Sequence, residues 1–127
     1  MQEQHLFEYA IIRLVPQVER EEFINVGVIL FCASQKFLQT AYHLSEEKLQ
    51  AFSCEIDTQE IEQRLIAFDR VCNGKKEGGP VGHFSIASRF RWLTATRSTI
   101  LQTSKVHPGF CTNAAVELQR LMGQFVL

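Results

Sequence analysis

The chain has 127 residues, of which 46% are hydrophobic and 21% are charged, and its formal net charge is −1. This length fits a single domain over residues 1–127, and the apolar content excludes a disordered protein. The longest apolar run, residues 24–33, is interrupted by Asn25 and Gly27, whereas a membrane-spanning helix needs about twenty apolar residues. The amino terminus also lacks the basic and then apolar layout of a secretion signal. We therefore expect a cytoplasmic protein without a membrane segment.

Three strands are predicted in the amino-terminal part of the chain, over residues 7–15, 23–31 and 37–44. These segments are rich in aromatic and β-branched residues, and Pro16 closes the first of them. Apolar side chains occupy both faces of the first strand, so we expect it to be central in the sheet. The short connection to the second strand favours an antiparallel hairpin, because a parallel neighbour needs a crossover of about a dozen residues.

The second predicted strand contains two unusual residues, Asn25 and Gly27, and the first contains Arg13. Gly27 weakens a strand unless there is a bulge or another group lies close above it. Strict alternation places the side chains of Ile24, Val26, Val28 and Leu30 on one face of this strand, opposite Asn25 and Gly27. Arg13 and Asn25 need hydrogen-bonded partners if they are buried. We predict that they form a polar cluster with the backbone near Gly27, and the alternative is a structural cluster that fixes strand register.

Helix signals dominate the rest of the chain. The predicted elements are helices starting at Ser45, at Asp57 with Glu60, and at Ser85, a glycine-rich loop over 74–82, a strand over 97–106, and a last helix capped by Thr112 or Asn113. Pro108-Gly109 is expected to terminate the fourth strand. Together these elements predict an α+β fold with a mainly antiparallel sheet of about four strands and helices packed on one face, in the order βββααα(β)α.

Residues 89–107 form the most cationic part of the chain. Between Glu77 and Glu117 there is no Asp or Glu, so this interval sums to +4 while the remainder sums to −5. Such asymmetry indicates an anionic partner, because the planar fork of Arg holds phosphate or carboxylate in two bonds and nearby hydroxyls can complete the shell. The predicted ligand-binding residues are Arg89, Arg91, Arg97, Thr99, Thr103 and His107, together with Arg13 and Asn25.

We predict that at least three of Arg89, Arg91, Arg97 and His107 converge on one surface. The alternative is that each Arg packs its stem on the core and pairs with an acid from another element.

The four cysteines, Cys32, Cys54, Cys72 and Cys111, contain no Cys-x-x-Cys pair. This spacing argues against a structural zinc site, and the expected cytoplasmic setting argues against disulfides. We predict four free thiols, with Cys32 and Cys72 in the core. No motif calls for a metal or a cofactor, so none is expected.

Two stretches resemble the bacterial domain-of-unknown-function family 3037. The first runs from Tyr9 to Phe31 and includes Arg13, Val15-Pro16, Arg20, Glu22-Phe23 and Asn25-Val26-Gly27-Val28. The second is RFRWLTATRSTILQTSKVH, which departs from the family at Thr96 and Lys105, where proline is frequent. The resemblance implies no established activity. It does imply an accessory or partner role, because members are similar to small proteins encoded beside kinase-like proteins of the bacterial persistence-toxin type.

The sequence favours an accessory binding module that recognises an anionic, phosphate-bearing ligand or an acidic protein partner such as that kinase-like neighbour. A nucleic-acid-associated protein is a second hypothesis, which a single Trp and four basic residues in the cationic interval disfavour. A small phosphoryl-transfer or hydrolytic enzyme is a third, with His107 as acid or base and Arg89 or Arg97 on the developing charge. No catalytic motif names a reaction, and the oligomeric state is left open.

Overall fold

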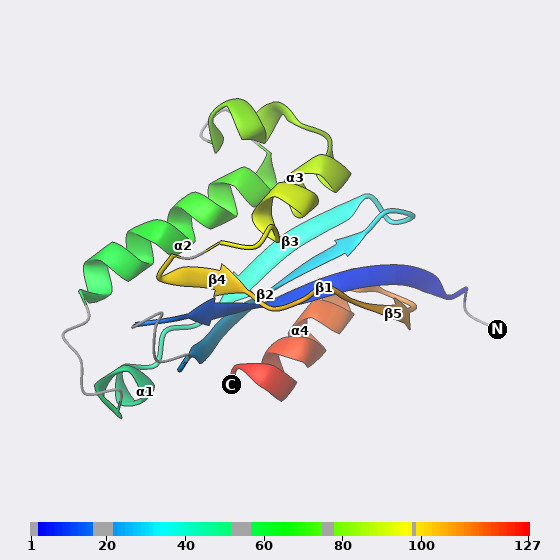
Figure 1. Cartoon of the computed structure of the whole chain (residues 1–127). Coiled ribbons are helices and arrows are strands. Elements are labelled where there is room, and N and C mark those ends of the chain that lie inside the picture. Colours follow the sequence, from blue (N-terminus) through cyan, green and yellow to red (C-terminus); the bar gives the residue numbers. More distant parts are fainter. Residues whose placement is uncertain (1–2, 17–21, 52–56, 75–77, 98) are drawn as a thin grey trace.

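An antiparallel sheet of five strands forms the centre of the protein (Figure 1). The computed structural model describes residues 3–16, 22–51, 57–74, 78–97 and 99–127. The strands are β1 (His5–Leu14), β2 (Ile24–Cys32), β3 (Phe37–Tyr42), β4 (Leu101–Thr103) and β5 (His107–Cys111). β2 pairs with one edge of β1, and β4 and β5 pair one after the other with its opposite edge. The predicted antiparallel sheet and the central place of its first strand are therefore confirmed.

Helices cover both faces of this sheet. They are α1 (Glu46–Ala51), α2 (Thr58–Asn73), α3 (Ile86–Leu93) and α4 (Ala114–Phe125), with the short 3-10 turn η3 (Pro80–His83) before α3. α2 and α3 lie on one face and α4 lies on the other (Figure 1). The α+β class and the order of elements are confirmed, but the prediction that the helices share one face is wrong for α4. The reason lies in β1, whose apolar side chains point to both faces, so each face needs a covering layer.

Two hydrophobic cores result from this arrangement. The core under α2 and α3 contains Ile12, Leu65 and Phe90, and the core under α4 contains Ile11 and Leu118, all of them nearly inaccessible to water. Adjacent residues Ile11 and Ile12 thus belong to different cores, as the alternation of side chains along a strand requires.

A β-bulge in β2 changes which side chains face which core. Arg13 pairs with Asn25, but Ile12 pairs with Gly27, so Val26 is the extra residue. Beyond the bulge, Val28 and Leu30 face α4, while Ile24 and Val26 face α2 and α3. The single face predicted for these four residues is therefore wrong, because one inserted residue reverses the alternation.

Gly27 allows β3 to approach β2 closely at this bulge. A Cβ atom at this position would lie 2.5 Å from the carbonyl oxygen of Ala41 and 2.9 Å from Cβ of Tyr42. Both explanations expected for a glycine inside an apolar strand, a bulge and a close neighbouring group, are confirmed.

The predicted fourth strand is divided into two short strands along the same edge of β1. β4 covers only Leu101–Thr103, and β5 passes through Pro108 and Gly109, which were expected to end the strand. Ser104 separates the two: its backbone N–H donates to the Ile11 carbonyl, and its Oγ accepts from the Ile11 N–H at 2.8 Å. Pro108 is tolerated because β5 is an edge strand, whose outer edge needs no hydrogen-bond partner from another strand.

All four predicted helix starts are confirmed at their caps, and at the start of α1 the N–H of Lys48 donates to Oγ of Ser45. The side chain of Asp57 accepts from the N–H groups of Gln59 and Glu60, Ser85 accepts from that of Ser88, and Asn113 accepts from that of Val116. Asn113 is therefore the cap of α4. Residues 75–77 of the predicted loop lie outside the described residues, and Pro80–His83 form η3 instead of an irregular loop.

The described cysteines agree with the prediction of free thiols. Cys32, Cys72 and Cys111 are free and buried, whereas Cys54 lies outside the described residues. Within the described part of the chain, no group of three or more His, Cys, Asp and Glu residues could hold a metal ion. No helix there has the length and the apolar character needed to cross a membrane.

Candidate functional site

The cationic segment 89–107 spans α3, the following turn, β4 and the start of β5, and its side chains take different directions. Arg91 points from α3 to Glu8 of β1, with Nη1 at 2.6 Å from Oε2 and Nη2 at 3.1 Å from Oε1. This hydrogen bond to Glu8 raises the pKa of Arg91 above its usual value. Arg91 therefore follows the alternative interpretation, in which an acid from another element neutralises the cation.

Arg89 faces the carboxyl end of α2. Its Nη1 donates to the carbonyl oxygen of Phe84 at 2.6 Å, and its guanidinium covers Gly74, the left-handed residue that ends α2 with φ 68°. A positive charge is favourable here because the carbonyl groups at a helix carboxyl end carry partial negative charge. Arg89 is thus held by the fold, next to a helix end that attracts it.

His107 lies on the opposite side of the sheet from α3. It is paired with Tyr9 in the ladder between β1 and β5, and the two rings are 5.5 Å apart at their centroids. Tyr9 packs against the α4 core and stacks on Phe125 of α4. The structure therefore places His107 and Arg91 on opposite sides of the sheet.

The predicted polar pair in the sheet, Arg13 and Asn25, lies on the α4 face. The two residues are direct partners across β1 and β2, and Asn25 Nδ2 donates to the carbonyl oxygen of Phe125 at 3.1 Å. The Arg13 guanidinium stacks on the ring of Phe23 at 4.1 Å. Arg13 Nε and Asn25 Oδ1 are buried without a hydrogen bond to the described residues. The pair is thus adjacent and partly buried, but its two side chains bind different groups.

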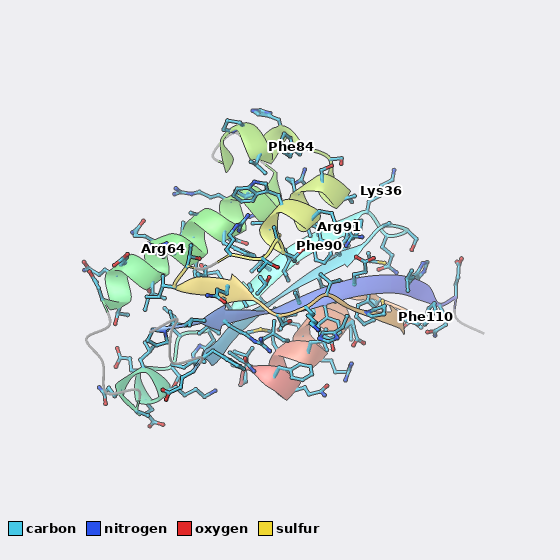
Figure 2. The ribbon with its side chains drawn as sticks, in the orientation of Figure 1. Lys36, Arg64, Phe84, Phe90, Arg91 and Phe110 are labelled. Atoms are coloured by element: carbon cyan, nitrogen blue, oxygen red, sulfur yellow. The ribbon has the colours of Figure 1, made fainter. Side chains whose placement is uncertain are left out.

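Three of the predicted ligand residues do come together, in a pocket of about 320 Å³ between α2, the end of α3 and β4. They are Arg97, Thr99 and Thr103, and Arg64 of α2 joins them. Figure 2 labels Arg64 on α2 and Arg91 on α3, both on the side of the sheet away from α4. This pocket, lined by Arg64, Arg97, Thr99, Thr103 and apolar side chains, is called the α2–β4 pocket below.

Trp92 fixes the position of Arg97 at this pocket. The Arg97 guanidinium lies 4.2 Å from the centroid of the Trp92 ring, and Nη2 donates to the Trp92 carbonyl oxygen. Stacking and this bond hold the planar group in one orientation, which reduces the conformational entropy lost when a ligand binds. Within the described part of the chain, Arg97 forms no ion pair with a carboxylate.

The hydroxyl groups of the pocket are already used as donors. Thr99 Oγ1 donates to the Leu101 carbonyl oxygen at 2.7 Å, and Thr103 Oγ1 donates to that of Thr94 at 3.4 Å. A hydroxyl has only one proton to donate. These threonines therefore do not offer a free O–H to an anion in this conformation, and the remaining charged donors are on Arg97 and Arg64.

Sequence reasoning missed the α2 wall of the pocket. That wall consists of Arg64, Ala67, Phe68 and Val71. The core-facing stripe of this helix, formed by Ile61, Leu65, Phe68 and Cys72, is buried. A second stripe at the same helical spacing, formed by Arg64, Ala67 and Val71, flanks it and could have indicated a partly exposed side that combines a cation with small apolar residues.

Fold and site together define an α+β protein with a ligand-sized, mainly apolar pocket beside one face of an antiparallel sheet. The chain belongs to the DUF3037 family, described as a protein of unknown function, whose model matches residues 9–126. Comparisons with curated proteins and with solved structures gave no match. The matched range includes both stretches that carry the resemblance, so the family is shown over nearly the whole chain.

Proposed function

We propose that this protein is an accessory binding module whose α2–β4 pocket receives an anionic group from a ligand or from an acidic protein partner. The observation that supports this is Arg97, which is oriented by Trp92 and has no carboxylate partner among the described residues. An oriented and unpaired guanidinium at the rim of a pocket is suited to binding a carboxylate, sulfate or phosphate group.

Local charge supports the same assignment. The interval between Glu77 and Glu117 contains no acidic residue, and it supplies Arg97 and the adjoining wall of the pocket. Arg64 adds a second positive charge, although Glu60 accepts from it at 3.1 Å. That ion pair is exposed on both sides, so it is weak and can exchange for a bound anion. A kinase-like neighbour would fit as a partner if it presents an acidic group to this pocket.

The geometry gives no comparable support to an enzyme. The third hypothesis requires His107 to act with Arg89 or Arg97, but His107 packs on Tyr9 on the α4 side and Arg89 faces the end of α2. A proton donor must be within hydrogen-bond reach of the group that it serves. The three side chains therefore do not form one reaction centre.

The test is thermal unfolding in sodium sulfate, sodium acetate and sodium chloride at equal ionic strength. A ligand at ten times its dissociation constant adds about 1.4 kcal/mol to the stability of the folded state by mass action. Sulfate also stabilises most proteins by exclusion from their surface, so the informative quantity is the increment that depends on Arg97.

We expect Arg97→Ala to lose the anion-specific increment and Arg70→Ala to keep it. Arg70 is a matched control because it is an exposed arginine of α2 that does not line the pocket. Its replacement by alanine changes the net charge by the same amount. Equal increments in wild type and Arg97→Ala for both anions would contradict the proposed function.

A further inference from the structure

We infer that the ligand of the α2–β4 pocket is a small amphipathic carboxylic acid, with an apolar body and one carboxylate. This inference rests on the proposed function, because it uses the same pocket and the same cation. Apolar side chains form most of the lining, and Ala67, Val71, Trp92 and Leu101 among them are exposed or partly exposed. An inorganic ion would leave these walls in contact with water, whereas an apolar body would cover them.

The number of free donors favours a carboxylate over a phosphate. Thr99 and Thr103 have already donated their hydroxyl protons to backbone carbonyl oxygens, and Gln102 Nε2 donates to the Thr99 carbonyl oxygen at 2.8 Å. Arg64, the other cation of the pocket, is engaged by Glu60 through both Nε and Nη2. Arg97 therefore supplies the principal charged donors that are not already engaged, in a planar fork that matches the two oxygens of one carboxylate. A phosphate group has three acceptor oxygens, which would be left incompletely satisfied here.

The size of the pocket favours a small molecule. Its volume of about 320 Å³ lies at the lower end of the range for small-molecule sites, roughly 300–1,000 Å³. Such sites combine apolar walls with a few polar groups that fix the orientation of the ligand. Arg97, which Trp92 orients at the rim, would hold the carboxylate, and the wall between α2 and β4 would bury the apolar body.

Trp92 allows binding to be followed at the site itself, because it is the only tryptophan of the chain and it lines the pocket. Acetate, butyrate and hexanoate should be titrated at constant ionic strength and pH 7 while Trp92 fluorescence is recorded. Each buried methylene is expected to tighten binding roughly fourfold, which corresponds to about 0.8 kcal/mol. Hexanoate should therefore bind at least about tenfold more tightly than acetate, with incomplete burial taken into account.

Two variants separate the apolar and the charged contributions. Ala67→Leu places a larger side chain in the pocket at an exposed helical position, and it should remove most of the advantage of hexanoate over acetate. Ala115→Leu is the matched control, an exposed alanine of α4 on the opposite face of the sheet, and it should leave the series unchanged. Arg97→Ala should weaken the binding of all three acids by a similar factor.

The inference is overturned if hexanoate binds no more tightly than acetate, or if its advantage persists in Ala67→Leu. In either case an Arg97-dependent stabilisation by sulfate or acetate would leave the proposed function standing. Loss of both the chain-length dependence and the Arg97-dependent stabilisation would contradict the two proposals together.

Discussion

Replacing Gly74 by alanine tests whether Arg89 belongs to the scaffold. Gly74 ends α2 with φ 68°, a left-handed conformation that costs an alanine about 1–2 kcal/mol. A Cβ atom there would also overlap the guanidinium of Arg89, so the side chain must move. Moving it breaks the hydrogen bond from Nη1 to the Phe84 carbonyl oxygen, for a further loss of about 0.5–1.5 kcal/mol. Gly74→Ala should therefore destabilise the wild-type chain by roughly 1.5–3.5 kcal/mol.

The coupling between the two residues is measured by a double-mutant cycle with urea unfolding. In an Arg89→Ala background, only the backbone cost of about 1–2 kcal/mol should remain for Gly74→Ala. The difference between the two backgrounds isolates the contact of Arg89 with the end of α2. If Gly74→Ala costs the same in both backgrounds, the reasoning is refuted and Arg89 is free to serve a ligand.

Two further predictions concern buried side chains, that of Ser104 directly after β4 and that of Cys72 in α2. In urea unfolding, Ser104→Ala should cost about 1–3 kcal/mol, because it leaves the Ile11 N–H without its acceptor. Ser88→Ala, at an exposed position, should cost under about 0.5 kcal/mol in the same assay. Equal losses in the two variants would contradict the role of Ser104. Burial raises the pKa of Cys72 from 9.0 to about 11. As pH rises, the Cys72 thiol ionises in the unfolded chain before it ionises in the folded one. The free energy of unfolding should therefore fall by roughly 2 kcal/mol between pH 8.5 and 10.5. Cys72→Ala should lose this part of the pH dependence, and an identical profile in wild type and variant would contradict the assignment.

Local patterns accounted for most of the elements. Side chains such as Asp57, Ser85 and Asn113 cap the helices that their positions predicted, because a cap bonds N–H groups two or three residues away. The apolar residues on both faces of β1 likewise indicated a central strand. Those residues also imply two covering layers, which the prediction of helices on a single face does not provide.

The irregular parts of the sheet depend on contacts between distant residues. Gly27 indicates that a bulge or a close neighbour is present, but the position of the bulge at Val26 is set where β1 and β2 pair. The division between β4 and β5 depends on Ser104, which forms a hydrogen bond with Ile11, a residue 93 positions earlier in the sequence. Local propensity does not locate either feature, because each position is decided by which backbone groups find partners across the sheet.

By itself, the sequence determined the α+β class, the central strand, the helix caps and the concentration of cations in one acid-free interval, since all of these follow from neighbouring residues or from composition. Only the tertiary structure decided what those cations do. Arg91 meets Glu8, Arg89 meets the end of α2, His107 is on the other side of the sheet, and Arg97 remains at a pocket. Helix periodicity and strand pairing set these directions, because a few residues of separation along the chain can point two side chains to opposite sides of a layer.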